Sequence, residues 1–205
     1  MIFTIVGPSG AGKDTLIRGA LAARPDLRLV RRVITRPTAA GGEDFDGVAP
    51  EDFAAREARG DFALTWEAHG LSYGLPKGQF TDAGDVIFNG SRAALPEAAR
   101  VFPGLRVILV TAPGIVLAAR LAARRRETVE DIRARLSRAT FEMPEDITFQ
   151  TVINDASPEV GTARLLAALQ PVRAWRCSRW KRPDMSSPKR QRSSIAKGCG
   201  RTGEK

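Results

Sequence analysis

The sequence predicts an α/β fold in which helices cover both faces of a parallel core sheet, a three-layer sandwich. Two observations lead to this fold class. Apolar, β-branched runs typical of buried strands alternate along the chain with helical patterns, the order that a parallel sheet requires. The first such run, residues 2–6, leads through a glycine-rich loop into a helical pattern that ends near Pro25.

The glycine-rich loop has the spacing of a phosphate-binding P-loop, which predicts a P-loop NTPase fold. Its glycines let successive backbone N–H groups face one anion, the next helix adds its positive N-terminal end, and Lys13 reaches the β and γ phosphates of a nucleotide. A plain strand-to-helix turn is the alternative, which the flanking strand and helix disfavour. The candidate nucleotide-binding residues are Gly7, Pro8, Ser9, Gly10, Ala11, Gly12, Lys13, Asp14 and Thr15.

Asp14 stands where the motif calls for Ser or Thr, whose hydroxyl binds Mg²⁺. A carboxylate is also an oxygen ligand for Mg²⁺, although it adds a negative charge beside the phosphates. We therefore predict that Asp14 is a metal ligand, either directly or through water.

The remaining elements continue the alternation of strands and helices. Further core strands are expected at residues 29–34, 85–88, 105–111 and 151–154. Helices are expected at residues 94–101, from 113 onward, at 128–143 and at 158–169. A small insertion of mixed character, about residues 35–76, is expected to hold a helix at 53–59 and short strands at 62–66 and 71–73.

Positive charge is concentrated at the end of the chain. The net charge is +9, and residues 171–205 hold eleven of the 32 Lys and Arg residues but only two of the 23 Asp and Glu residues. Residues 1–170 are therefore neutral overall, and we expect them to form one domain. Apolar periodicity stops near Val172, which predicts a basic, disordered tail. A tether to RNA or to an acidic membrane is one interpretation of the tail, and a merely solvated extension is the one that a charge run favours.

Both cysteines, Cys177 and Cys199, fall in this tail, so no disulfide or cysteine-ligated metal is expected in the core. Met1 leads directly into a strand pattern without the regions of a signal peptide, and no apolar run reaches membrane-spanning length. These features predict a cytoplasmic protein without a membrane partner, and they leave the oligomeric state open.

Seven arginines are crowded into residues 120–138. A solvated helix face is one interpretation, and it fits Arg133 and Arg138. Arg120 and Arg124 lie one helical turn apart and Arg135 comes from the next helix, which favours a lid, about residues 120–135, that closes over polyphosphate and excludes water. The candidate catalytic residues are Lys13, Arg120, Arg124 and Arg135.

The chain offers no evident general base. His69, the only histidine, falls in a turn, where a structural role is the commoner one. An alcohol acceptor would need a base, whereas the oxygens of a phosphate acceptor are already mostly ionised near neutral pH. The sequence therefore favours transfer of a phosphoryl group to another phosphate.

Motifs along nearly all of residues 1–170 resemble the guanylate kinase family of P-loop kinases. Besides the P-loop they are Thr35-Arg36-Pro37, Gly42-Glu43, Glu67-Ala68-His69-Gly70, Tyr73-Gly74, Arg120-Leu121 with Arg124, Arg135-Leu136 and Asn154-Asp155. The resemblance implies a guanylate-kinase-like fold with ATP as phosphoryl donor. It also implies that Arg36, Glu43 and Tyr73 surround the acceptor phosphate and that Asn154 lies near the adenine of ATP.

The residues that recognise guanine in the guanylate kinase family differ in this chain. The two positions that hydrogen-bond guanine there are Leu64 and Leu75 here, and the second phosphate arginine, expected three residues after Arg36, is Ala39. A leucine cannot pair with a base edge, so the site loses much of its selectivity for guanine. We expect both leucines to line a pocket for an acceptor without a base.

The chain is more similar to the ribose 1,5-bisphosphate phosphokinases of phosphonate breakdown. The motifs that carry this similarity are Gly12-Lys13-Asp14, Ile34-Thr35-Arg36, Trp66 and Asn89-Gly90-Ser91-Arg92. The last of them stands where guanylate kinases have acids, so Asp14 would keep one carboxylate near Mg²⁺. The resemblance adds Asn89, Ser91 and Arg92 to the substrate residues, with Ser91 and Arg92 near the other phosphate or the hydroxyls of the sugar.

This resemblance implies ATP-dependent phosphorylation of ribose 1,5-bisphosphate to 5-phosphoribosyl 1-diphosphate (PRPP), with ADP released and Mg²⁺ as cofactor. A phosphorylated sugar is then the partner, and nucleic acid is not expected because only the tail is basic. Two alternatives stay open: a guanylate or other nucleoside monophosphate kinase, and a catalytically inactive interaction module. The presence of Lys13 and of a cationic lid disfavours the second.

Overall fold

The computed structural model describes residues 1–37, 44–81, 84–123 and 143–170. They belong to one compact unit, Met1–Arg173. The second unit, Ala174–Lys205, lies outside the described residues. The basic tail and the helix expected at 128–143 fall almost wholly outside them as well.

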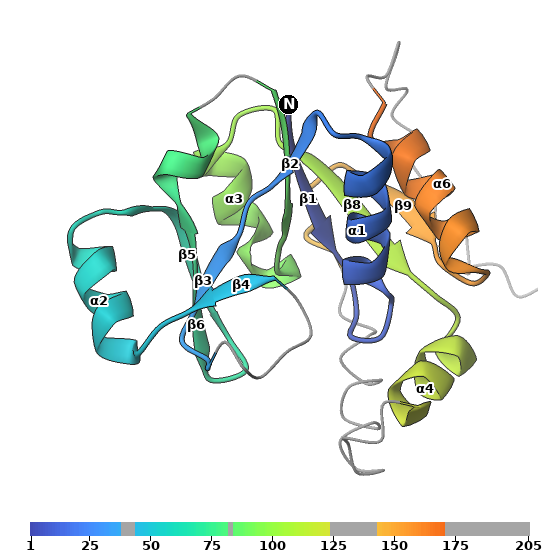
Figure 1. Ribbon diagram of the computed structural model, residues 1–205, viewed down its shortest axis with the longest axis horizontal. Coiled ribbons are helices and arrows are strands. Elements are labelled where there is room, and N and C mark those ends of the chain that lie inside the picture. The colour runs from blue at the N-terminus through green and yellow to red at the C-terminus, as the bar shows by residue number, and fades with distance from the viewer. Residues whose placement is uncertain (38–43, 82–83, 124–142, 171–205) are drawn as a thin grey trace, which may run out of the picture. The chain divides into compact units, whose positions relative to one another are not determined.

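Five parallel strands form the core sheet, in the order β2-β7-β1-β8-β9 (Figure 1). The strands are β1 (Ile2–Val6), β2 (Leu27–Leu29), β7 (Asp85–Asn89), β8 (Arg106–Thr111) and β9 (Phe149–Ile153). The central strand β1 is buried from Phe3 onward, as a strand covered on both faces should be. The predicted α/β fold with a parallel core sheet is thereby confirmed.

Helices pack on both faces of this sheet. They are α1 (Lys13–Ala23), α3 (Leu95–Val101), α4 (Gly114–Ala123) and α6 (Pro158–Ala168). A further helix, α2 (Pro50–Ala58), packs against the second sheet described below. Phe3 and Ile5 of β1 pack into one apolar cluster with residues of α1 and α6, whereas Val6 points to the other face and packs with Leu95 of α3. Within the described ranges, no helix is long and apolar enough to cross a membrane.

A second sheet of four strands lies beside the core, in the order β4-β3-β6-β5. Its strands are β3 (Arg32–Ile34), β4 (Phe45–Gly47), β5 (Phe62–Ala68) and β6 (Leu71–Pro76). Helix α2 covers one face, where Phe53 packs on Val33 and Phe62. The other face joins the core sheet through a cluster that contains Leu64, Leu75 and Phe88.

The strand expected at 29–34 is in fact two strands in two different sheets. Strand β2 ends at Leu29 in the core sheet, and β3 starts at Arg32 in the second sheet. At the crossing, the Val30 N–H donates to the Ile87 carbonyl (2.9 Å). The side-chain amide of Gln79 then replaces a strand partner for Arg31, accepting from its N–H (2.8 Å) and donating to its carbonyl (2.9 Å).

Candidate active site

The P-loop joins the end of β1 to the start of α1, and its conformation depends on glycine. Gly12 has a φ of 86°, in the left-handed region. A Cβ placed on it would lie 2.5 Å from Nδ2 of Asn154, and a Cβ on Gly7 would lie 1.9 Å from the Val110 carbonyl oxygen. Both positions therefore exclude a side chain, and the loop can pack this closely against β8 and Asn154 only with glycine there.

Lys13 is the first residue of α1, and its side chain turns back over the loop. Its Nζ donates to the carbonyl oxygens of Gly7 (2.9 Å) and Pro8 (3.1 Å). This places an ammonium group against the loop backbone, beside the positive end of the helix. The arrangement can neutralise the phosphates of a nucleotide, as predicted for Lys13, although no ligand tests that role.

Asn154 connects the P-loop to two neighbouring elements through hydrogen bonds. Its Nδ2 donates to the Ala11 carbonyl (2.8 Å), its backbone N–H donates to the Thr111 carbonyl (2.7 Å), and its own carbonyl accepts from Arg120 (2.9 Å). The side chain is only 4% exposed. It thus ties the loop, strand β8 and helix α4 together, and its predicted place near adenine stays a prediction.

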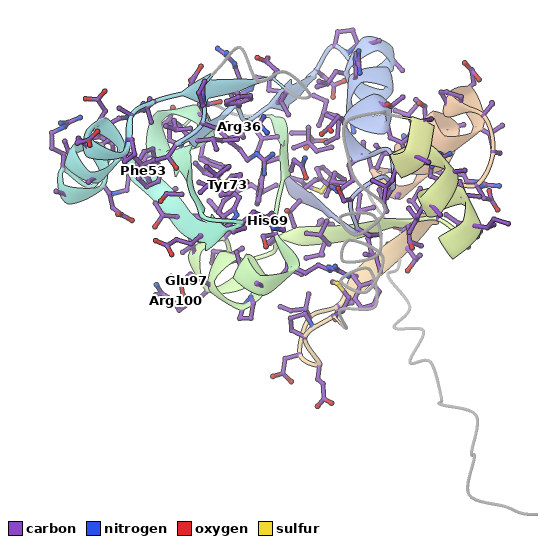
Figure 2. All side chains as sticks on the ribbon, turned by 90° about the horizontal axis from the view of Figure 1, so that it is seen from below. Arg36, Phe53, His69, Tyr73, Glu97 and Arg100 are labelled. Atoms are coloured by element: carbon purple, nitrogen blue, oxygen red, sulfur yellow. The ribbon has the colours of Figure 1, made fainter. Side chains whose placement is uncertain are left out.

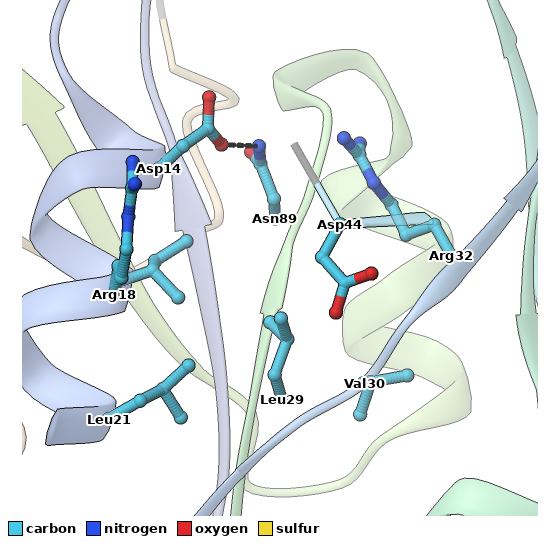
Figure 3. Close-up of a pocket in the computed structure, with 9 residues that line it drawn as sticks. Asp14, Arg18, Leu21, Leu29, Val30, Arg32, Asp44 and Asn89 are labelled. Carbon is cyan, nitrogen blue, oxygen red and sulfur yellow. Dashed lines mark hydrogen bonds between the residues drawn. The ribbon is translucent and has the colours of Figure 1, made fainter. Parts of the chain in front are cut away.

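Asp14 lies in the first turn of α1 and faces the end of strand β7. The Asn89 side chain donates to its carboxylate, from Nδ2 to Oδ1 at 3.0 Å (Figure 3). A carboxylate held at the N-terminus of a helix is stabilised by the helix dipole. Asn89, expected near the substrate, therefore fixes the direction of the predicted metal ligand.

A cavity of about 440 Å³ opens between α1 and the chain that leads into β3. Its polar lining consists of Asp14, Arg18, Arg32, Asp44 and Asn89 (Figure 3). Leu29 and Val30 form part of an aliphatic floor. Figure 3 shows Asp14 and Arg18 on one side and Arg32 and Asp44 on the other, with Asn89 between them.

The second sheet contributes a group of cations and aromatic rings. The Arg36 guanidinium carbon lies 4.4 Å from the ring centroid of Phe45. Tyr73 stacks on Trp66 with ring centroids 5.3 Å apart and planes inclined by 4°. Figure 2 shows Arg36 and Tyr73 on this sheet, and His69 at the turn between β5 and β6. His69 is exposed and has a φ of 56°, in keeping with the structural role expected of it.

Ser91 and Arg92 follow strand β7 and begin the short 3₁₀ helix η3 (Arg92–Ala94). Burial lowers the pKa of the Arg92 guanidinium from its ordinary value. An arginine stays protonated at neutral pH even so, and a partly desolvated guanidinium binds an anion more strongly than a hydrated one. Their predicted contact with the sugar is not tested by these positions.

The two leucines at the guanine-reading positions do not line the cavity. Leu64 is 4% exposed and Leu75 is fully buried, and both pack against Val86 and Phe88. The expectation that they form a pocket wall is wrong because the second sheet turns this face onto the core sheet. Three other predicted site residues, Glu43, Arg124 and Arg135, lie outside the described residues.

Sequence reasoning missed the aliphatic lining and three polar residues of the cavity: Arg18, Arg32 and Asp44. Arg32 had only part of a signal. In an extended strand alternate residues share a face, which puts Arg32 on the same side of β3 as Ile34. Only the structure shows that Ile34 pairs with Tyr73 of β6. Arg18 had a weaker signal, because it lies one helical turn after Asp14.

Comparison with known proteins identifies the family. A search against protein-family models gave no match. The chain is 46% identical over 172 residues to the bifunctional ribose 1,5-bisphosphokinase-thymidine phosphorylase of Cupriavidus necator, with 82% of this chain and 29% of that protein covered. It is also 46% identical to the ribose 1,5-bisphosphate phosphokinase PhnN of Rhizobium etli, with 82% of this chain and 89% of that protein covered.

The fold has a solved counterpart. A guanylate kinase from Anaplasma phagocytophilum matches with a TM-score of 0.58 at 18% identity, over 82% of each chain, so the guanylate-kinase-like fold is confirmed. The chain spans less than a third of the length of the bifunctional relatives. It covers 89% to 96% of the single-function relatives from Rhizobium etli, Agrobacterium fabrum and Ruegeria. On this similarity, the chain belongs to the ribose 1,5-bisphosphate phosphokinase family.

Proposed function

We propose that the chain catalyses the ATP-dependent phosphorylation of ribose 1,5-bisphosphate to PRPP, with release of ADP. The observation that carries the proposal is the cavity beside the P-loop, in which Arg18 and Arg32 lie on opposite sides of an aliphatic floor. A small sugar with phosphates matches this lining, because guanidinium groups pair with phosphate oxygens and carboxylates accept hydrogen bonds from hydroxyls. The names of the family's members support the same substrate.

The P-loop is the proposed donor site. The backbone N–H groups of the loop and the N-terminus of α1 would bind the nucleotide phosphates. Lys13 would exchange its hydrogen bonds to the Gly7 and Pro8 carbonyls for bonds to phosphate oxygens. Arg120, now held by the Asn154 carbonyl, is positioned to add a second cation beside the loop.

Asp14 fits a magnesium ion that is shared with the nucleotide. Mg²⁺ prefers one or two carboxylates together with water and phosphate oxygens, and it rarely occupies a site made of protein alone. The described residues contain no group of three or more His, Cys, Asp or Glu side chains that could hold a metal. The single carboxylate of Asp14, oriented by Asn89, is enough for an ion that takes its other ligands from water and phosphate. When bound, the ion would neutralise charge on the transferred phosphoryl group.

The chemistry proposed for the acceptor needs no base. An ionised oxygen of the 1-phosphate attacks the γ-phosphorus, the bond from that phosphorus to the bridging oxygen of ADP breaks, and ADP takes the negative charge. The residues of the chain then act by holding the two reactants in line and by neutralising charge. Arg36, Tyr73, Ser91 and Arg92 are the residues that we propose for the acceptor.

Product identification tests the proposal directly. The full chain is incubated with ATP, Mg²⁺ and, in separate reactions, ribose 1,5-bisphosphate, ribose 5-phosphate or GMP, and the products are identified by phosphorus NMR and mass spectrometry. We expect PRPP and ADP in equal amounts from ribose 1,5-bisphosphate and little turnover of the other two. Preferential formation of GDP from GMP would overturn the assignment in favour of a nucleoside monophosphate kinase.

A further inference from the structure

Arg32 is the only charged side chain classed as buried in the described part of the chain, with 7% of its surface exposed. Removing a cation from water costs free energy unless charges or dipoles compensate for it. Its position at the cavity wall means that a ligand can reach it while bulk water is largely excluded. An anion bound there would interact through a lower dielectric than one bound to an exposed arginine.

Two aromatic rings hold the Arg32 guanidinium in place. Its central carbon lies 5.3 Å from the ring centroid of Tyr73 and 6.0 Å from that of Trp66. The two rings are themselves stacked, with their planes almost parallel. Contact with an aromatic face favours a cation electrostatically and restricts a planar guanidinium, so less entropy is lost when it binds a ligand.

Arg31, the residue before Arg32, is held by ion pairs and by backbone hydrogen bonds. The Arg31 side chain bonds the carboxylates of Asp44 (3.0 Å) and Asp46 (2.9 Å), and its backbone bonds the Gln79 amide. Arg31 directly precedes β3, so these contacts fix the chain where Arg32 enters the strand at the cavity wall. The same ion pair holds Asp44 at the cavity rim.

The opposite wall of the cavity belongs to the phosphate-transfer site. Asp14 and Asn89 lie at the same end of the cavity as the Arg32 guanidinium, whereas Leu29 and Val30 lie toward the other end (Figure 3). A phosphate between Arg32 and Asn89 would therefore be the one that faces the P-loop. The sugar would then lie over the aliphatic floor, with its hydroxyls within the reach of Asp44.

We propose that Arg32 is the principal binding residue for the acceptor phosphate that receives the phosphoryl group, with Trp66 and Tyr73 as its support. This inference rests on the proposed function, and it adds a residue and a cavity that the predicted site did not contain. In this arrangement a buried arginine, and not contacts with a base, supplies much of the affinity for the acceptor.

The test compares three variants of the full chain. Arg32→Gln removes the charge, and Arg32→Lys keeps the charge but loses the planar fork. Arg56→Gln is the matched control, because Arg56 belongs to helix α2, its guanidinium carbon lies 5.2 Å from the ring centroid of Phe62, and it does not line the cavity. The readouts are steady-state KM values for ribose 1,5-bisphosphate and for ATP, calorimetric titration of ribose 1,5-bisphosphate, and thermal unfolding.

We expect Arg32→Gln to raise the KM and Kd for ribose 1,5-bisphosphate by about 10- to 100-fold, the loss typical of one charge-assisted hydrogen-bonded contact, and to change the KM for ATP less than about twofold. Arg32→Lys should give a smaller loss, and Arg56→Gln should match the parent chain. An unchanged acceptor KM in Arg32→Gln, or equal increases for acceptor and ATP, would refute the inference.

Failure of the proposed function gives a different result. If the parent chain does not convert ribose 1,5-bisphosphate, the proposed function is refuted. Calorimetric titration with ribose 5-phosphate as the probe then tests whether Arg32 binds a sugar phosphate. Weaker binding of this probe to Arg32→Gln than to the parent supports the inference about the cavity. Equal binding, or no binding to the parent chain, refutes it.

Discussion

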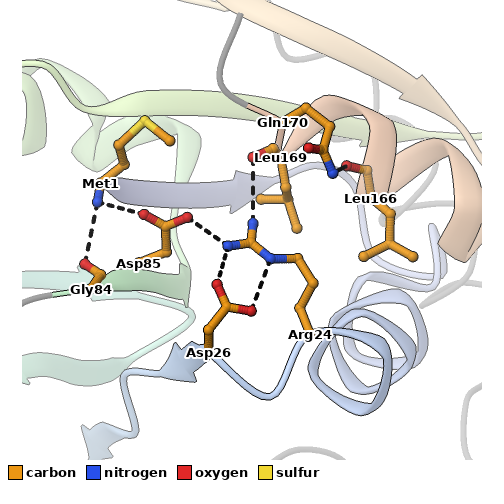
Figure 4. Close-up of polar contacts among 8 residues, drawn as sticks. All are labelled: Met1, Arg24, Asp26, Gly84, Asp85, Leu166, Leu169 and Gln170. Atoms are coloured by element: carbon orange, nitrogen blue, oxygen red, sulfur yellow. Dashed lines mark hydrogen bonds and ion pairs between the residues drawn. The ribbon is translucent and has the colours of Figure 1, made fainter.

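The two ends of the core sheet use positive charge differently. At the amino end, Arg24 pairs with Asp26 and Asp85, Asp85 also accepts from the Met1 amine, and Arg24 donates to the Leu169 carbonyl (Figure 4). At the carboxyl end, Lys13 and Arg120 donate to backbone carbonyls of the P-loop and of Asn154. Arg24 at the amino end bonds carboxylates, whereas Lys13 and Arg120 at the carboxyl end donate to neutral carbonyl groups that a phosphate can replace.

The pKa values of Arg24, Asp85 and Arg92 agree with this comparison. Burial raises the pKa of Asp85, but hydrogen bonds from the Met1 amine and from Arg24 outweigh it and hold the pKa below its ordinary value. The hydrogen bonds to Asp26 and Asp85 raise the pKa of Arg24. For Arg92, at the carboxyl end, burial lowers the pKa. The amino end is therefore expected to contribute stability, and the carboxyl end to contribute binding.

Replacing Lys13 should give the largest effect, and on activity alone. Lys13→Met removes a cation that neutralises charge developing during transfer, and we expect turnover to fall by about 10³-fold or more. Steady-state assays measure the loss, and thermal unfolding should show a folded chain. Lys77→Met, at an exposed position of η2 (Lys77–Phe80), is the control. Comparable activity in the two variants would contradict the assignment of the donor site.

Replacing Asn154 tests whether its contacts with the P-loop support nucleotide binding at the carboxyl end of the sheet. Asn154→Ala leaves the Ala11 carbonyl without its buried donor, which should lower stability by about 1–3 kcal/mol and kcat/KM for ATP by about 10- to 100-fold. Gln150→Ala, on the same strand, should change neither quantity appreciably. A loss of stability with an unaltered KM and kcat for ATP would make Asn154 a purely structural residue.

Replacing Asp14 tests whether the carboxyl end of the sheet binds Mg²⁺ through this carboxylate. Asp14→Ser replaces a charged oxygen ligand by a neutral one, so the Mg²⁺ concentration that gives half-maximal activity should rise by about tenfold, with a smaller change in the KM for ATP. Asp52→Asn, which lies in the first turn of α2, serves as the control. Superimposable magnesium titrations for the parent and Asp14→Ser would remove Asp14 from the metal site.

Asp85 gives the smallest expected effect, and on stability alone. A carboxyl whose pKa is lowered by folding stabilises the folded state fully above its ordinary value of 3.8 and loses that contribution as pH falls through the lower folded-state value. Asp85→Asn should therefore cost about 1 kcal/mol near pH 7 and less below pH 3.8. Urea unfolding across pH measures this difference. A difference that grows as pH falls would contradict the sign, and turnover at pH 7 should be normal.

The sequence could predict the parts of the fold that depend on neighbouring residues. The strand, P-loop and helix of residues 2–23 are recognisable because their glycine spacing and apolar periodicity are local. The division of residues 27–34 between two sheets was not predictable, because an apolar strand pattern does not say which strand it will pair with. The burial of Leu64 and Leu75 and the position of Arg32 depend on the same non-local packing, so the cavity lining was missed in part.

The path of the chain through the second sheet has a consequence for how such a protein can change. Strands β2 and β7 are hydrogen-bonded neighbours, with Leu27 opposite Asp85, and the described strands between them, β3 to β6, all belong to the second sheet. Most of the proposed acceptor residues are thus encoded by a single segment of the gene. Exchanging that segment between homologues, with the core contacts of Leu64 and Leu75 kept, offers a modular route to new acceptor preferences on an unaltered nucleotide-binding half.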